Sequence, residues 1–348
     1  MRNGTTTRTR RRYLKWLTAL AVVYLVLCAV IGVYLAEVAV KPFRREMPAN
    51  ALAVARDQLK PIGAEITEVS IEGGDRTPLR AWLYSPKAPN GSAVLALHGV
   101  SANRRSLIGY AEMMLKAGYT VLTPDARAHG ASGGAIATYG VVERGDIDLW
   151  LEWLRDHQHG QGCIHAFGSS MGAAQVLQIV DGPGIASAGA DGAASALGGA
   201  VEGRSARNML CSAVAEAPFS TFREIAYDRV GQYINVGDWL GRTLMRPAVE
   251  VGFITARLRY GVDLDLADPA SHLLHTRTPV LLIHGLADTN IPPRHVQFMH
   301  AGNPAMLNVW LVAGARHVGA WRKEPKAYES RVLGFFAAHQ PALASSSQ

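Results

Sequence analysis

The most constraining feature of this sequence is an alternation of short apolar runs with longer amphipathic stretches. The runs, rich in Val, Ile, Leu and Ala, are residues 93–97, 120–123, 164–167, 213–216, 280–284 and 307–312. Such runs are typical of parallel strands buried on both faces. Two earlier runs, 65–71 and 79–84, flank Gly73, Gly74 and Asp75 and predict a β-hairpin. We therefore expect an α/β fold with a mostly parallel sheet and helices on both faces.

An uncharged apolar run over residues 16–36 precedes this pattern. At about 1.5 Å per residue it reaches across a hydrocarbon core of about 30 Å. We expect a transmembrane helix over 16–40, preceded by a basic arm over 1–15. A cleaved signal peptide is the main alternative, but its apolar region spans about 7–15 residues and ends in small residues. Tyr34 and Glu37 stand where those small residues belong.

The distribution of Lys and Arg around the apolar run predicts its orientation. The residues before it are Arg2, Arg8, Arg10, Arg11, Arg12 and Lys15. Only Lys41, Arg44 and Arg45 follow it closely. Basic residues favour the cytoplasmic side, so we expect a single-pass protein with a cytoplasmic N-terminus. The folded domain that follows the helix is then expected in the periplasm or outside the cell.

The formal net charge of +7 does not predict a nucleic-acid partner, because much of the basic excess lies in the N-terminal arm. Three cysteines do not make a disulfide framework. Cys28 lies within the apolar run, while Cys163 and Cys211 lie where core strands are expected to start. We interpret the last two as buried free thiols rather than as a functional pair. The cysteines then leave the redox compartment undecided.

The rest of the chain divides into a linker over 41–60, an α/β domain over 61–340 and a tail over 341–348. Gly, Ala and Ser dominate residues 182–203, which predicts a flexible surface insertion. Residues 219–268 are helical in pattern, with an apolar face. This segment is expected to be a small helical lid over a pocket, or else helices packed on the edge of the sheet.

The sequence Gly168-Ser169-Ser170-Met171-Gly172 fits the G-x-S-x-G pattern. It directly follows a predicted strand and opens a predicted helix, as a nucleophile elbow requires. Glycines two residues either side of the serine let strand and helix approach closely. Ser170 is therefore the candidate nucleophile, at a helix N-terminus that favours developing negative charge.

A serine nucleophile needs a base, and the base needs an acid that fixes its tautomer, in the chain order Ser, acid, His. Asp288 follows the predicted strand 280–284, and His317 follows the last strand. Both stand at C-terminal strand ends, where α/β sheets gather their sites. We expect Asp288 and His317 to complete the triad. The rivals for these two roles are His98, His129, Asp263, Asp265 and Asp268.

The oxyanion formed by serine attack needs two backbone N–H donors. Met171, directly after the nucleophile, is one candidate. Val100, in the loop after the strand 93–97, is the other.

These motifs together resemble the α/β-hydrolase superfamily over about residues 65–340. Within it, the chain is similar to bacterial membrane-anchored or secreted hydrolases of the serine aminopeptidase, acylglycerol lipase and acyl-peptidase groups. The motifs that carry the resemblance are His98-Gly99, residues 124–130 with Ser132-Gly133-Gly134, the elbow, His284-Gly285 with Asp288, and His317. Ala128 stands where Gly is frequent in these groups, and the insertion at 182–203 is unusual for them.

The resemblance implies an α/β-hydrolase fold with about eight mostly parallel strands, an acyl-enzyme on the serine, and no cofactor or metal. By that likeness, Asp125, Arg127 and His129 shape loops and are not catalysts. We expect a small-molecule ester or acyl substrate. Peptide or amide hydrolysis is the second hypothesis, and a binding protein on the same fold is the third.

Overall fold

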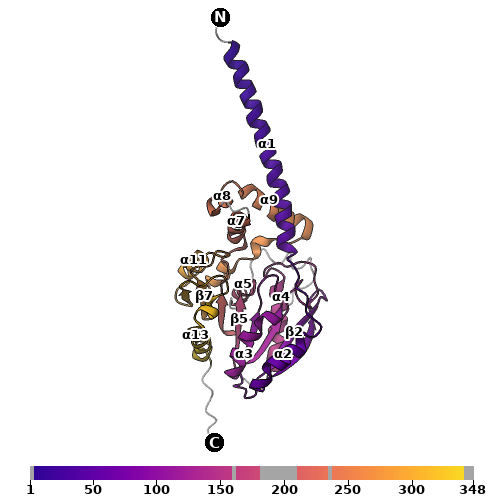
Figure 1. The fold of residues 1–348 in the computed structure, drawn as a ribbon, viewed down its shortest axis with the longest axis vertical. Coiled ribbons are helices and arrows are strands. Elements are labelled where there is room, and N and C mark those ends of the chain that lie inside the picture. The colour runs from indigo at the N-terminus through magenta and orange to yellow at the C-terminus, as the bar shows by residue number, and fades with distance from the viewer. Residues whose placement is uncertain (1–3, 159–161, 181–209, 234–236, 341–348) are drawn as a thin grey trace. The chain divides into compact units, whose positions relative to one another are not determined.

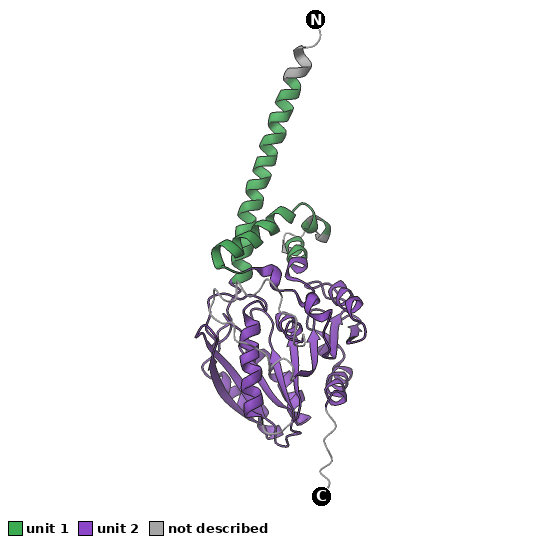
Figure 2. Cartoon of the chain, turned by 180° about the vertical axis from the view of Figure 1, so that it is seen from behind, with its two compact units in different colours: residues 1–40, 226–262 green, residues 41–225, 263–348 purple. Residues whose placement is uncertain are grey.

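The computed structural model describes residues 4–158, 162–180, 210–233 and 237–340 of the 348-residue chain. The chain divides into two compact units, coloured separately in Figure 2. We call residues 1–40 and 226–262 the anchor unit, and residues 41–225 and 263–348 the sheet unit. The predicted insertion at 182–203 and the tail at 341–348 lie outside the described residues.

The sheet unit is built on an eight-stranded sheet with the strand order β1-β2-β4-β3-β5-β6-β7-β8 (Figure 1). The pairs β1–β2 and β2–β4 are antiparallel, and every later pair is parallel. The predicted hairpin and the mostly parallel α/β architecture are both confirmed. The strands are β1 (Glu65–Glu72), β2 (Pro78–Ser85), β3 (Ala93–Leu97), β4 (Thr120–Pro124), β5 (Ile164–Ser169), β6 (Leu210–Glu216), β7 (Val280–Gly285) and β8 (Leu307–Val312).

The central strands are buried on both faces because helices cover both. In β3, Leu95 belongs to one apolar cluster while its neighbours Val94 and Ala96 belong to the other. Successive side chains of a strand point to opposite faces, so a continuous apolar run fills two cores. The first face packs against α4 (Glu143–His157), α5 (Met171–Leu177), α10 (Pro269–Leu273) and α11 (Arg294–Gly302). The second packs against α2 (Ala51–Leu59), α3 (Ile108–Lys116), α12 (Ala320–Lys323) and α13 (Pro325–Ala338).

Part of the predicted linker is structured. Residues 51–59 form α2, whose Ala51, Ala55 and Leu59 are buried. These three side chains recur every fourth residue, so they share one helix face that packs on the second core. Short 3₁₀ turns precede or join other elements at η1 (Lys60–Ile62), η2 (Arg104–Leu107) and η4 (Leu264–Leu266).

The prediction that Cys163 and Cys211 are free thiols is wrong, because the structure joins them in a disulfide. Cys163 immediately precedes β5, and Cys211 is the second residue of β6. The two strands pair in parallel with Ile164 opposite Leu210 and His165 opposite Ser212, so Cys211 lies at a shift in register, and its Cα is 5.8 Å from that of Cys163. Cys28 is free and buried.

The anchor unit contains α1 (Gly4–Val40), α8 (Gly237–Arg242), α9 (Arg246–Tyr260) and most of α7 (Phe222–Tyr233). Helix α1 runs through the predicted basic arm, and its segment Thr9–Val40 is long and apolar enough to cross a membrane. It packs closely on α9: a Cβ atom on Gly32 would lie 2.4 Å from the Ala248 carbonyl oxygen. Residues 219–268 are largely helical, as predicted, and their movement as a lid stays a prediction.

Candidate active site

Ser170 lies in a sharp turn between β5 and α5, as the elbow pattern predicts. Strand β5 ends at Ser169 and α5 begins at Met171. Ser170 itself has φ +55° and ψ −117°, a conformation that costs a non-glycine residue free energy. The Ser170 N–H donates to the Glu216 carbonyl oxygen at 2.8 Å, so the neighbouring strand β6 holds the turn.

The two glycines of the elbow stand where no side chain fits. A Cβ on Gly168 would lie 2.3 Å from the Gly172 carbonyl oxygen, and a Cβ on Gly172 would lie 2.3 Å from that of Leu97. Real Cβ atoms do not approach backbone this closely. The close contact lets α5 begin directly under the end of β3, with Ser170 at the C-terminal edge of the sheet.

The structure brings the three predicted triad residues together from distant parts of the chain. His317 Nε2 lies 2.8 Å from Ser170 Oγ, and His317 Nδ1 lies 2.8 Å from Asp288 Oδ2. Asp288 follows β7 and His317 follows β8, and these parallel strands end at the same edge as β5. Ser170 and Asp288 are buried, while the His317 side chain keeps 21% of its surface exposed. The imidazole is thus the member of the three that solvent reaches.

Asp288 is held as a carboxylate by the groups around it. Burial alone would raise its pKa, but hydrogen bonds from His284 and His317 and the Ile291 N–H outweigh burial. The pKa of Asp288 therefore lies well below its ordinary value. Its Oδ1 also accepts the Asn290 and Ile291 N–H groups at 2.9 and 3.0 Å. A fixed negative charge at Oδ2 orients Nδ1–H of His317 toward it and leaves Nε2 free to accept the serine proton.

Glu216 is a buried carboxylate behind the site that sequence reasoning missed. It accepts hydrogen bonds from Tyr328 Oη at 2.8 Å, Ala320 N–H at 3.0 Å and Tyr110 Oη at 3.2 Å. Burial raises the pKa of Glu216, although these donors oppose the shift. Ala320 follows His317 by three residues, so Glu216 ties down the turn that carries the imidazole. The available signal was a lone acidic residue closing an apolar strand at the edge of the sheet where Ser170 lies.

The loop after β3 passes beside the nucleophile. A Cβ on Gly99 would lie 3.2 Å from the Cβ of Ser170 and 3.8 Å from its Oγ. Val100 is the next residue in this loop, and Met171 is the first residue of α5. The backbone N–H groups of Val100 and Met171 remain the proposed oxyanion donors.

The histidine rivals hold the loops after β3 and β4. The Ala126 N–H donates to Nε2 of His98 at 3.1 Å, so the proton of that ring sits on Nδ1 and is donated to the Gly99 carbonyl oxygen at 2.8 Å. Burial lowers the pKa of His98 to about 3 and keeps the ring neutral. His129 Nδ1 lies 2.7 Å from the Arg127 carbonyl oxygen, and burial lowers the pKa of His129 as well.

The aspartate rivals lie in other local structures before β7. Asp263 and Asp268 accept backbone N–H groups as caps of η4 and α10. Asp265 pairs with Arg223 at 2.5 Å. None of the three is in the hydrogen-bond chain of Ser170.

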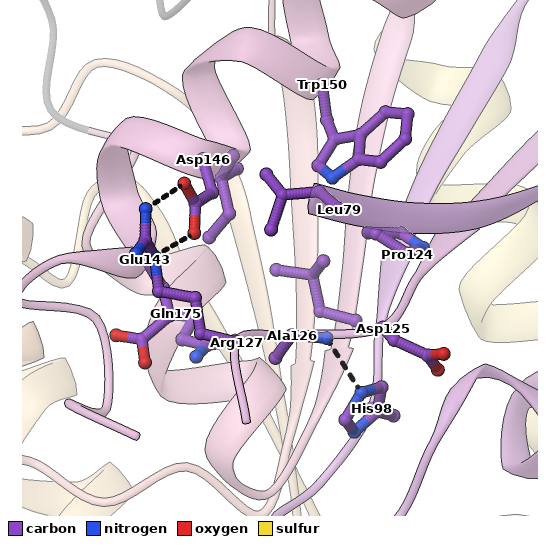
Figure 3. Close-up of a pocket in the computed structure, with 12 residues that line it drawn as sticks. Leu79, His98, Pro124, Asp125, Ala126, Arg127, Glu143, Asp146, Trp150 and Gln175 are labelled. Carbon is purple, nitrogen blue, oxygen red and sulfur yellow. Dashed lines mark hydrogen bonds and ion pairs between the residues drawn. The ribbon is translucent and has the colours of Figure 1, made fainter. Parts of the chain in front are cut away.

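Loops after β3 and β4 are braced by the ion pairs of two buried arginines. Arg104 Nη1 lies 2.7 Å from Asp125 Oδ2, and Arg127 is bound by both Asp75 and Asp146. Figure 3 shows the Arg127–Asp146 pair and the His98–Ala126 hydrogen bond lining one pocket. These contacts agree with a loop-shaping role for Asp125, Arg127 and His129. Among the described residues, no group of three His, Cys, Asp or Glu side chains is arranged to hold a metal ion.

The sequence of this chain is similar to that of known proteins. A family model described as the alpha/beta hydrolase family matches residues 94–330. The chain belongs to this family. The α/β hydrolase is also 24% identical over 245 residues to the uncharacterized protein YqkD of Bacillus subtilis (strain 168), a match that covers 70% of each chain.

Solved structures resemble the α/β hydrolase at low identity. The Pyrococcus furiosus esterase Pf2001 matches with a TM-score of 0.62 and 23% identity, over 86% of this chain and 99% of that one. A Pyrococcus horikoshii acylaminoacyl peptidase matches with a TM-score of 0.56 and 15% identity, over 88% of this chain and 46% of that one. At these identities the likeness establishes the fold, which esterases and peptidases share.

Proposed function

We propose that this α/β hydrolase is a serine hydrolase that cleaves a carboxylic ester through an acyl-enzyme on Ser170. The observation that carries the proposal is the unbroken hydrogen-bond chain from Ser170 Oγ through His317 to Asp288, with 2.8 Å at each step. This arrangement has the order and contacts that turn a serine hydroxyl into a nucleophile.

In the first half-reaction, Ser170 Oγ attacks the ester carbonyl carbon while its proton passes to Nε2 of His317. Asp288 stabilises the imidazolium that forms, and the N–H groups of Val100 and Met171 receive the oxyanion. The tetrahedral intermediate collapses as the C–O bond to the leaving alcohol breaks. His317 gives its proton to that alcohol, which leaves the acyl group on Ser170.

Water completes the reaction by the same route. His317 takes a proton from the water as its oxygen attacks the acyl-enzyme carbonyl. Collapse of the second intermediate returns the proton to Ser170 Oγ and releases a carboxylic acid. Each turnover therefore consumes one ester and one water and yields one alcohol and one carboxylic acid.

The preference for esters over peptides rests on resemblance to the acylglycerol lipase group and on the esterase Pf2001 as a structural neighbour. Purified enzyme should be tested on p-nitrophenyl esters of increasing acyl length and on aminoacyl amides, with Ser170→Ala as the control. Ester turnover that the control loses is the expected result. Amide turnover without ester preference would replace the esterase proposal by the peptidase of serine aminopeptidase type.

We further infer that α1 anchors the enzyme in a membrane, with the N-terminus in the cytoplasm and the sheet unit in the periplasm or outside the cell. The apolar length of α1 and the excess of basic residues before it support this orientation. The Cys163–Cys211 disulfide supports it too, because disulfides persist in oxidising compartments. A C-terminal fusion to a reporter that works only in the cytoplasm should be inactive, and an active fusion would reverse the orientation.

A further inference from the structure

We propose that α8, the α8–α9 turn and the outward face of α9 are immersed in the lipid leaflet at the C-terminal end of α1. The partner of this surface is the acyl region of a bilayer. The inference rests on the proposed membrane anchor and is independent of the proposed chemistry. All the residues that carry it belong to the anchor unit (Figure 2).

Helix α9 and the turn before it pack alongside α1 over several turns. The Tyr24 hydroxyl donates to the Leu244 carbonyl oxygen at 2.5 Å. Two turns further along α1, Gly32 lies against the backbone of Ala248. At the far end, Arg259 pairs with Glu37 at 2.8 Å. Helix α1 therefore has protein beside it from Tyr24 to Glu37.

The part of the apolar run that does not pack against α9 or the turn before it is too short to cross a bilayer. The uncharged run extends from Trp16 to Ala36, and only eight positions precede Tyr24. At about 1.5 Å per residue those positions reach about 12 Å, against a hydrocarbon core of about 30 Å. The rest of the hydrocarbon core must be crossed by the segment of α1 that packs against α9. If α1 spans the membrane while packed this way, Leu244 lies at a depth where its outside neighbours are acyl chains.

Large apolar side chains are exposed on the outward surface of these elements, as contact with lipid requires. Four large apolar side chains of these elements remain exposed in the folded chain. Their exposed fractions are 71% for Trp239, 53% for Leu244, 56% for Ile254 and 81% for Leu258. Ile254 and Leu258 are four residues apart on α9, so they project from one face. Exposed side chains of this size beside an apolar helix mark a membrane or protein contact. The adjoining apolar surface of α1 makes the bilayer the occupant that fits.

The described arginine side chains of the same elements contact protein partners or lie at the end of the span. The Arg246 guanidinium lies 5.4 Å from the centre of the Tyr227 ring, and Arg242 pairs with the buried Asp228 at 2.8 Å. Such pairing lowers the cost of placing Arg near lipid. Arg257 and Arg259 lie in the last turn of α9, where Arg259 meets Glu37 at the end of the apolar run. The long side chains of these two arginines are expected to reach the phospholipid headgroups from there.

The experiment measures the depth of single positions in the full-length protein, reconstituted in phosphatidylcholine–phosphatidylglycerol vesicles. Cys28→Ala provides the background, since Cys163 and Cys211 are joined in a disulfide. An environment-sensitive dye is attached through Ile254→Cys or Leu258→Cys. Two reference positions are Val22→Cys, exposed on α1, and Phe298→Cys, exposed on α11 of the sheet unit. Quenching by nitroxide on lipid acyl chains is compared with quenching by iodide in the water.

We expect the dye at 254 and 258 to be quenched by the lipid nitroxide, like the dye at 22, and to be shielded from iodide several-fold better than the dye at 298. Quenching by the lipid at 22 but not at 254 or 258 overturns the immersion of α9 and leaves the anchor standing. No lipid quenching at 22 overturns the anchor and the immersion together. Ester hydrolysis by the same labelled samples reports separately on the proposed chemistry.

Discussion

Replacing Asp288 by asparagine tests how the acid supports catalysis with the smallest change in shape. The amide has one oxygen and one NH₂ group, and the protein decides which way round they sit. Two backbone N–H groups, from Asn290 and Ile291, point at Oδ1. Turning NH₂ toward them would leave donors facing donors, at a cost of about 1–3 kcal/mol for each unsatisfied group. The amide oxygen therefore takes the Oδ1 position.

That orientation directs the NH₂ group at Nδ1 of His317, where Oδ2 lies at 2.8 Å in the parent. Nδ1 must then accept a hydrogen bond, so the ring proton moves to Nε2. An Nε2–H cannot take the proton of Ser170. We expect kcat/KM for a p-nitrophenyl ester to fall by about 10³–10⁴-fold, which is about 4–5.5 kcal/mol of transition-state stabilisation.

The matched control is Asp268→Asn, which changes a rival aspartate that caps α10. Asparagine caps helices about as well as aspartate, so this variant should keep parental activity. Thermal unfolding of both variants checks that each is folded. If Asp288→Asn retains activity within about ten-fold of the parent while folded, the tautomer argument is refuted and Asp288 is not the acid of the triad.

Three further predictions concern the frame around the triad. Gly172→Ala should destabilise the fold by about 1–3 kcal/mol and lower activity, because its Cβ would lie 2.3 Å from the Leu97 carbonyl oxygen. The control is Gly334→Ala, which has open space at its Cβ. Equal unfolding midpoints for the two variants would contradict the close packing at Gly172. Burial lowers the pKa of His98 to about 3, so the unfolded chain binds a proton at a higher pH than the folded chain does, and stability should fall as the pH drops below about 6.5. Denaturant titrations of His98→Gln should show a smaller loss of stability between neutral and mildly acidic pH. An unchanged slope of stability against pH would argue against a buried neutral ring. Replacing both Cys163 and Cys211 by serine should lower the free energy of unfolding by about 2–4 kcal/mol. Reductant added to the double variant gives the baseline, because that variant has no disulfide to break. A loss on substitution no larger than this baseline would show that the disulfide does not form.

Much of the sheet unit was predictable because its signals are local. Each central strand is a continuous apolar run, and the elbow combines a strand, two glycines and a helix within a few residues. Asp288 and His317 followed from chain order and from their places after β7 and β8. Their approach to Ser170 is a property of the parallel sheet, since these strands end at one edge.

Other features depended on which strands become neighbours, and the sequence does not state this directly. Cys163 and Cys211 are joined because β5 pairs with β6, a fact of strand order. Glu216 gathers Tyr110, Tyr328 and Ala320 from three separate segments, so its network has no local pattern. Helix α2 did carry a signal, the spacing of Ala51, Ala55 and Leu59, but its composition is weakly apolar and reads as linker.

The most direct test of the central claim is labelling of the full-length protein by a fluorophosphonate, which reacts with a serine only when a base activates it. Peptide-level mass analysis of the labelled protein should find the adduct on Ser170, with none in Ser170→Ala. His317→Ala should label far more slowly at the same position. Folded parent protein that stays unlabelled, or that carries the adduct on another residue, would contradict an activated Ser170 and favour a binding protein on this fold.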